Sequence, residues 1–87
     1  MQQTILRLPS VRAETGYSRS TIYLRIAQGL WPKPVSLGAR AVGWPANEVA
    51  TLNASRISGK TEQEIRSIVI NLEADRSLAF AVTGASK

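Results

Sequence analysis

Two closely spaced prolines constrain the fold of this chain more than any other feature. Pro32 and Pro34 each lack a backbone N–H and restrict the residue before them, so Leu30–Pro34 cannot be helical. This stretch therefore separates a helix-forming segment, which precedes it, from a segment of different structure, which follows it.

The segment before the prolines predicts two short helices joined by a glycine turn. Pro9 suits the first turn of a helix, and we expect that helix to cover residues 9–15 and to end at Gly16. Ser18 is a good N-cap for a second helix, and Gly29 is a good stop for it. This spacing is typical of a helix-turn-helix. The residues before it, 4–8, are expected to be extended.

The second predicted helix has a narrow apolar side, formed by Ile22 and Ile26, and a wide polar side. Such a helix suits a DNA major groove, where hydroxyls and amides meet base edges and arginines meet guanine or phosphate. Taken alone, this window also fits an ordinary amphipathic surface helix. The DNA contacts expected from this helix are Ser18, Arg19, Ser20, Thr21, Tyr23, Leu24, Arg25 and Gln28.

A β-hairpin is predicted after the prolines, with strands at 35–37 and 41–44 and a turn at 38–40. Isolated hairpins are marginal in water, so this one should pack on the helices. The expected packing contacts are Leu30, Val35, Leu37, Val42 and one face of Trp44. A hairpin directly after a recognition helix is typical of a wing, which contacts phosphate or the minor groove. We therefore add Lys33 and Arg40, the latter at the tip, to the expected DNA contacts.

Two further helices are expected after the hairpin. One covers residues 46–57, with Val49 and Leu52 facing inward, and Gly59 closes it. The other begins at a capping box, residues 61–64, and carries one apolar stripe. The stripe consists of Ile65, Ile68, Val69 and Leu72. Ile70 lies off it, either as a partner surface or as a singly exposed isoleucine that needs no explanation.

These elements predict a mainly α protein with a small β-hairpin, a winged helix-turn-helix with additional C-terminal helices. Residues 1–60 would form the DNA-binding domain. Residues 61–87 would form a C-terminal helix and tail, packed on that domain or used for self-association.

Charge is uneven along the chain, whose formal net charge is +5. Residues 1–60 hold eight basic and two acidic side chains, whereas residues 61–87 hold three basic and four acidic ones. The basic excess of the first part indicates a polyanionic partner. A solvated basic surface without a partner is the alternative.

Several function classes are not expected. The chain has no cysteine and no histidine, hence no disulfide, no zinc site of the usual ligands and no histidine base. It has no glycine-rich phosphate loop, and its six carboxylates look scattered or placed on a solvent-facing C-terminal segment. We expect no enzyme, metal, cofactor or small-molecule substrate. Without a visible signal peptide or membrane-length apolar run, we expect a cytoplasmic protein with no membrane partner.

The ordered set of motifs resembles the AlpA-type phage and prophage regulators over roughly residues 7 to 57. The residues that carry the resemblance are Arg7-Leu8-Pro9, Val11, Thr15-Gly16, Ser18-Arg19-Ser20-Thr21-Ile22-Tyr23, Gly29, Pro32-Lys33-Pro34-Val35, Leu37-Gly38, Arg40, Gly43-Trp44 and Glu48-Val49. These regulators are small winged helix-turn-helix proteins related to MerR-like domains and phage excisionases. The resemblance implies a recognition helix at residues 18–28 and a wing tip at 38–40. Many members have a basic residue at the position that Leu24 occupies in this chain. Leucine cannot make the phosphate or base contact of a basic residue, so a contact with a thymine methyl group becomes the alternative.

We therefore predict a sequence-specific double-stranded DNA-binding protein that regulates transcription of prophage or mobile-element genes. An excisionase-like recombination directionality factor that binds and bends DNA needs the same module and stays open. A basic protein-interaction or RNA-binding module is the alternative from a different class. The sequence is compatible with a homodimer or a cooperative oligomer on DNA, and the oligomeric state stays open.

Overall fold

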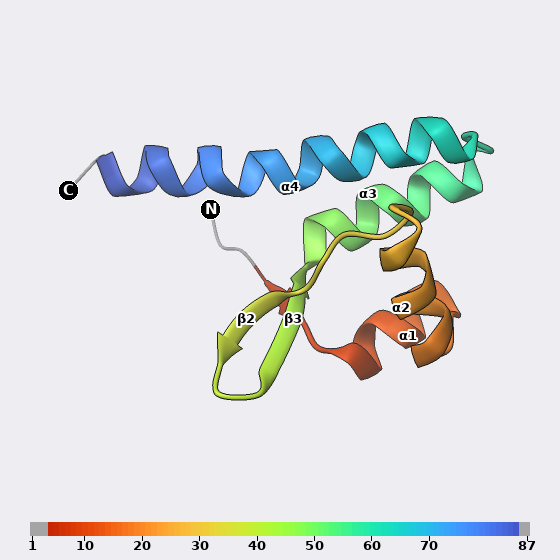
Figure 1. Cartoon of the computed structure of the whole chain (residues 1–87), viewed down its shortest axis with the longest axis horizontal. Helices are drawn as coiled ribbons and strands as arrows, with labels where there is room; N and C mark the ends of the chain where they lie inside the picture. Colours follow the sequence, from red (N-terminus) through yellow and green to blue (C-terminus); the bar gives the residue numbers. More distant parts are fainter. Residues whose placement is uncertain (1–3, 86–87) are drawn as a thin grey trace.

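The computed structural model describes the backbone of residues 4–85 and the side chains of residues 4–76. The elements are β1 (Ile5–Leu6), α1 (Leu8–Thr15), α2 (Arg19–Ala27), β2 (Val35–Gly38), β3 (Ala41–Pro45), α3 (Ala46–Ile57) and α4 (Glu62–Ala85). Figure 1 shows α4 lying along one side of the domain, while the β2–β3 hairpin projects from the other side. The predicted fold class is confirmed: four helices and a small antiparallel sheet, compatible with a winged helix-turn-helix.

The helix ends follow the local chemistry of the sequence. Gly16 and Gly29, both with φ +77, adopt the left-handed conformation directly after α1 and just beyond α2, respectively. The Ser18 hydroxyl accepts a hydrogen bond from the Thr21 N–H at 3.2 Å, so the predicted N-cap is confirmed. Helix α1 begins at Leu8, one residue before the predicted start, because proline is tolerated anywhere in a first turn whose N–H groups lack helical partners.

The extended lead-in is a third strand, so the predicted hairpin is part of a three-stranded sheet with the order β1-β3-β2. Strand β1 pairs antiparallel with β3, with Ile5 opposite Pro45 and Leu6 opposite Trp44. Gly43 permits this pairing. A Cβ on Gly43 would lie 2.5 Å from Ile5 Cγ2 and 2.9 Å from the Leu6 carbonyl oxygen. A side chain at this position would therefore push the first strand away.

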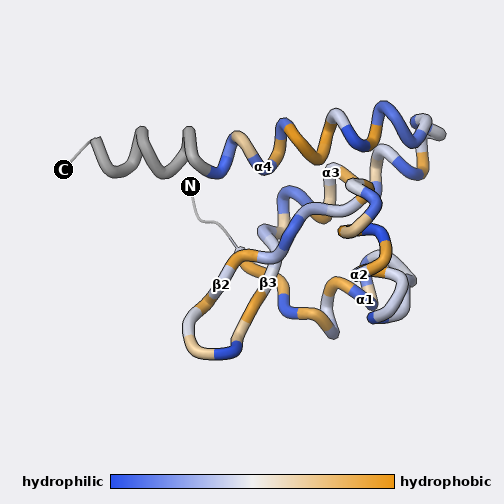
Figure 2. Tube along the Cα trace, in the orientation of Figure 1, coloured by the Kyte–Doolittle hydropathy of each residue, from blue (hydrophilic) through white to orange (hydrophobic). Residues whose placement is uncertain are grey.

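One core joins all the helices and the central strand. It consists of Val11, Ile22, Leu30, Trp31, Trp44, Val49, Leu52, Ile65 and Val69. The predicted core position of Trp44 is confirmed, and its indole N–H donates to the Pro32 carbonyl at 2.9 Å. Figure 2 shows the apolar residues of α3 and of the described part of α4 alternating with polar ones along each helix.

The predicted packing of Leu37 is wrong, because 43% of this residue is exposed. The pairing of β2 with β3 shifts register between Ser36 and Gly38. From there the hairpin extends beyond the helices (Figure 1), so the helices do not bury Leu37. Leu30 and Trp44 are buried as expected, and Val35 and Val42 are half-buried.

Helix α4 begins at the predicted capping box. The Thr61 N–H donates to Glu64 Oε1 at 2.8 Å, and the Glu64 N–H donates to Thr61 Oγ1 at 3.1 Å. The hydrogen bond from the Thr61 backbone, followed by that with its side chain, lowers the pKa of Glu64. Along the predicted stripe, Ile65 and Val69 are buried, whereas Ile70 is 66% exposed.

Candidate nucleic-acid interface

The N-terminus of α2 gathers three of the predicted DNA contacts. The Ser18 hydroxyl donates to Thr21 Oγ1 at 2.9 Å and lies 3.3 Å from Ser20 Oγ. Ser18 and Thr21 are therefore engaged in the helix cap, whereas Ser20 is exposed and can turn its hydroxyl to a new partner. This end of the helix offers short polar groups, which suit base edges.

The outward face of α2 is exposed along its length. Ser20, Leu24 and Ala27 follow one another at helical spacing, and Tyr23 lies beside them. The Arg19 guanidinium lies 5.6 Å from the centre of the Tyr23 ring, which brings these two predicted residues together. Ala27 belongs to this face although the sequence reasoning omitted it. The spacing of four and three residues from Ser20 was the signal for it.

Arg25 lies apart from this outward face. Its guanidinium lies 5.0 Å from the centre of the Tyr17 ring, and Arg56 from α3 lies 4.4 Å from the same ring. Arg56 also donates to the Thr15 carbonyl oxygen at 2.9 Å. The Arg25 Nε atom is buried. These contacts join the α1–α2 turn to α3 and fix the orientation of α2.

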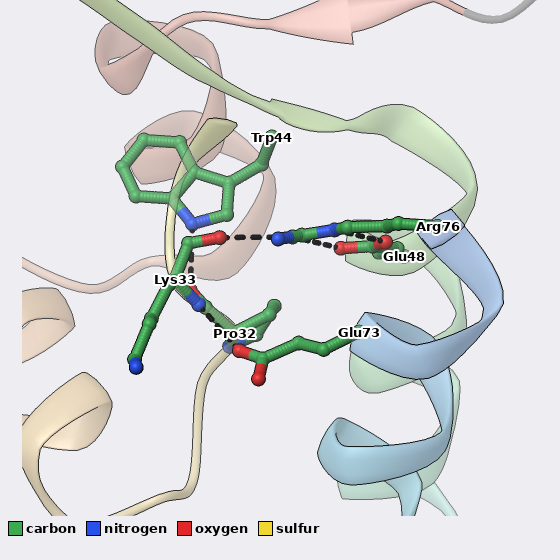
Figure 3. Close-up of polar contacts among 6 residues, drawn as sticks. All are labelled: Pro32, Lys33, Trp44, Glu48, Glu73 and Arg76. Carbon is green, nitrogen blue, oxygen red and sulfur yellow. Dashed lines mark hydrogen bonds and ion pairs between the residues drawn. The ribbon is translucent and has the colours of Figure 1, made fainter. Parts of the chain in front are cut away.

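Two other predicted contacts, Gln28 and Lys33, lie at the far end of α2 and just beyond it. Gln28 lies nine positions after Arg19. At 1.5 Å per residue this is roughly 13 Å along the helix. Gln28 is exposed, and its carbonyl oxygen accepts from Arg66 Nε at 2.9 Å. The Lys33 side chain points away from α4 into solvent, as Figure 3 shows.

Side chains of α4 hold the connector between α2 and β2. Glu73 accepts from the Lys33 N–H at 2.8 Å, and Arg76 Nη2 donates to the Lys33 carbonyl oxygen at 2.8 Å. Arg76 also binds both oxygens of Glu48, a residue that is 3% exposed, at 2.6 and 2.8 Å. Figure 3 shows this network beside the Trp44–Pro32 hydrogen bond. The loop that links α2 to the hairpin is therefore fixed from both sides.

This network corrects the expectation that the carboxylates are scattered or solvent-facing. Glu48 is buried and paired, and Glu73 binds a backbone N–H. The partners lie 28 and 40 residues apart in the chain, so no local pattern could reveal them.

The hairpin tip carries Arg40, which is exposed as predicted. A second arginine, Arg7, lies at its base, where its Nε donates to the Val42 carbonyl oxygen at 3.1 Å. Arg7 is also exposed, so its remaining guanidinium nitrogens face solvent beside the hairpin. Arg7 was not among the predicted contacts, because its position depends on a hydrogen bond to a residue 35 positions away.

The site residues thus form three groups on one continuous, carboxylate-free stretch of chain. One group lies at the N-terminal half of α2, one at the C-terminal end of α2 and the connector, and one at the hairpin tip. Residues 15–47 contain four basic side chains and no acidic one. Figure 1 places α1 and the hairpin tip on the side of the domain away from α4, whereas Gln28, directly after α2, contacts Arg66 of α4. A surface of this sign attracts polyanions.

Among the described residues, no group of three or more acidic, histidine or cysteine side chains could hold a metal ion. In the same part of the chain, no helix is both long and apolar enough to cross a membrane.

Comparison with known proteins gives one family and one relative. The profile of the prophage CP4-57 regulatory protein (AlpA) family matches residues 4–57, more than half of the 87 residues. The uncharacterized protein ORF88 of Enterobacteria phage P4 is 46% identical over 59 residues, which cover 68% of this chain and 67% of that protein. No solved structure matches the chain significantly. The family match ends with α3, so it does not extend to α4.

Proposed function

The chain belongs to the AlpA family of prophage regulatory proteins, and from this premise we propose that it is a sequence-specific double-stranded DNA-binding protein that controls transcription of prophage or mobile-element genes. The observation that supports this most is the exposed, carboxylate-free face of α2, followed directly by a projecting hairpin with an arginine at its tip. A DNA partner would place the protein in the bacterial cytoplasm. Its activity would be binding, not catalysis.

In this proposal α2 enters the major groove with its N-terminal half against the bases. Ser20 offers its hydroxyl to a base edge, and Leu24 contacts a thymine methyl group. Thr21 Oγ1 accepts from Ser18, so Thr21 reads a base by donating its own hydroxyl proton. Arg19 and Tyr23, already stacked on each other, approach a guanine or the backbone together. Ser18 contributes by ordering the first turn of α2, where it caps the helix.

The other predicted residues would contact the DNA backbone or support the helix. Arg40 at the hairpin tip and Lys33 in the connector each neutralise a phosphate. Gln28 contacts DNA beyond the bases read by the N-terminal half. Arg25, stacked on Tyr17, mainly holds α2 in its orientation. Arg7 joins Arg40 on the hairpin side as an added phosphate contact.

The test compares a base-reading change with a phosphate-binding change. Duplexes are first selected from a random library by the wild-type protein. Ser20→Ala should weaken binding to the selected duplex by about 1–3 kcal/mol and leave a scrambled duplex nearly unaffected. Arg40→Ala should weaken both duplexes by a similar factor and reduce the log–log salt slope by roughly one.

The controls lie on the far side of the domain. Ser67→Ala on α4 and Lys60→Ala in the α3–α4 turn change the same kinds of group at exposed positions. Both should leave affinity and salt slope close to wild type. Failure of the library to yield any preferred sequence would refute sequence-specific binding. Equal losses from Ser20→Ala on both duplexes would remove that serine from base reading.

A role in excision would use the same surface and add a bend in the DNA. Such a bend is measured by the gel mobility of duplexes that carry the selected site at different positions. Position-dependent mobility would favour the directionality factor, and uniform mobility the regulator alone. An RNA-binding role would be favoured if RNA competed as well as duplex DNA for the protein.

We also propose that more than one copy acts on the DNA. A single recognition helix of this length reads few base pairs, and regulators of this kind gain specificity from two half-sites. The selected duplexes would then contain two related half-sites.

A further inference from the structure

A groove runs along one side of α4, beside the C-terminal end of α2. Its volume is about 170 Å³. Its apolar lining includes Ile26, Trp31 and Val69. Three exposed or half-buried residues of α4 line its edge: Arg66, Ile70 and Glu73. Ile70 is 66% exposed there, although isoleucine gains by burial. The groove and a projecting apolar side chain therefore lie next to each other on one surface.

We propose that this surface binds a second copy of the chain, with the two α4 helices antiparallel and Ile70 on the two-fold axis. A two-fold contact uses the same patch on both subunits. Ile70 projects beside the groove of its own chain. This arrangement fits two-fold symmetry, because the Ile70 side chain of each copy then enters the groove of the other copy. The proposal deepens the proposed function by naming the contact that joins the two copies.

The charged residues on this side of α4 favour an antiparallel pair of helices. Arg66 lies four residues before Ile70, and Glu73 lies three residues after it, so all three share one side of the helix. When two such helices run antiparallel about Ile70, Arg66 of one copy faces the turn that carries Glu73 of the other, twice by symmetry. A parallel pair would instead place like charges together.

Arg66 and Glu73 each have charged atoms left for an ion pair with the other copy. Arg66 uses Nε for the Gln28 carbonyl oxygen, and its Nη2 lies 3.8 Å from Glu62, in an exposed ion pair of little strength. Glu73 uses Oε2 for the Lys33 N–H. The opposite carboxylate oxygen of Glu73 and the Nη1 atom of Arg66 have no ion pair with the described residues.

The length and position of α4 also fit a second copy. The helix continues to Ala85, and Figure 1 shows its C-terminal end extending past the rest of the domain. With Ile70 on the axis, residue 62 of one copy faces residue 78 of the other, an overlap of roughly 25 Å. The contact leaves the hairpin tip free, because the tip lies on the side of the domain away from α4 (Figure 1). The outward residues Arg19, Ser20 and Leu24 of α2 do not line the groove, so they also stay free.

The first experiment compares two matched substitutions by sedimentation velocity, without DNA. Ile70→Lys places a cation at the axis, and Ile57→Lys makes the same change on α3, at a residue that is 85% exposed and outside the groove. The wild type and Ile57→Lys should sediment at twice the monomer mass of 9.4 kDa as concentration rises. Ile70→Lys should raise the dimer dissociation constant at least tenfold. A monomeric wild type, or equal behaviour of the two variants, overturns the proposal.

A second experiment tests the antiparallel arrangement by mixing two variants. Arg66→Glu and Glu73→Arg should each lose the dimer, because each puts like charges face to face at both contacts. Mixed in equal amounts, they should form a heterodimer, since both contacts then join opposite charges. Thermal melts of each variant check folding. Folded variants whose mixture stays monomeric overturn this arrangement, and variants that do not fold leave the Ile70→Lys comparison to decide.

The dimer and the DNA-binding function fail in different ways. Self-association is measured without DNA, so it does not depend on a binding site. If the proposed function holds, Ile70→Lys keeps wild-type affinity for a single half-site and loses the gain from a second half-site. A dimer that binds no DNA would refute only the proposed function.

Discussion

The ion pair between Glu48 and Arg76 gives the sharpest prediction about stability. Arg76→Met removes two short hydrogen bonds to a carboxylate whose side chain is 3% exposed, while the side chain of Arg76 is itself 23% exposed. A buried charge left without its partner typically costs about 3–5 kcal/mol. At about 0.05–0.15 kcal/mol per residue, a chain of 87 residues has roughly 4–13 kcal/mol in total. Arg76→Met should therefore remove a large part of the stability.

Equilibrium urea unfolding measures the free energy of unfolding, and a thermal melt gives the midpoint. The midpoint should fall by roughly 12 °C or more, since each kcal/mol shifts a domain of this size by about 4–8 °C. The double variant Glu48→Met with Arg76→Met should recover most of the loss, because apolar side chains of similar volume replace a buried pair at little cost. Arg12→Met, on exposed α1 surface, is the control and should stay within about 0.5 kcal/mol of wild type.

Two outcomes would refute this reasoning. If Arg76→Met costs no more than Arg12→Met, the pair contributes nothing to the fold. If the double variant is no more stable than Arg76→Met alone, the loss comes from the Lys33 contact or from packing, and not from an unpaired Glu48.

Three further predictions concern the sheet, the start of α4 and α4 as a whole. Gly43→Ala should cost about 1–3 kcal/mol in a thermal melt, because its Cβ meets Ile5 and Leu6; an unchanged melt would show that β1 moves freely. The lowered pKa of Glu64 stabilises the protein above the ordinary range of a carboxyl, and this contribution is lost as pH falls through the lowered pKa. Melts from neutral to acid pH should thus decline less for Glu64→Gln than for wild type, and identical declines would contradict this. Ending the chain after Gly59 should lower the melting temperature, because Ile65 and Val69 leave the core and Glu48 loses Arg76. Any folded fraction should keep its affinity for a single half-site, and an equal melting temperature would contradict the packing.

The helices could be predicted from the sequence because the groups that begin and end them are close neighbours in the chain. Gly16 ends α1, Ser18 caps the start of α2, and Gly29 follows its end; the cap and the two left-handed turns depend only on near neighbours. The Thr61–Glu64 box starts α4 for the same reason. The outward face of α2 followed from helical spacing, and so did the inward positions of Val49 and Leu52.

The sequence alone therefore determined the order of the elements, the face that each helix buries and the family to which the chain is similar. Only the tertiary structure decided which distant residues meet: Arg76 with Glu48, Arg7 with Val42, and Arg25 and Arg56 on the Tyr17 ring. It also exposed Leu37 and opened the groove beside Ile70. The physical reason is the sequence separation over which each interaction acts. Caps and periodicity act over a few residues, whereas these contacts join positions that come together only when α4, α3 and the sheet pack around one core.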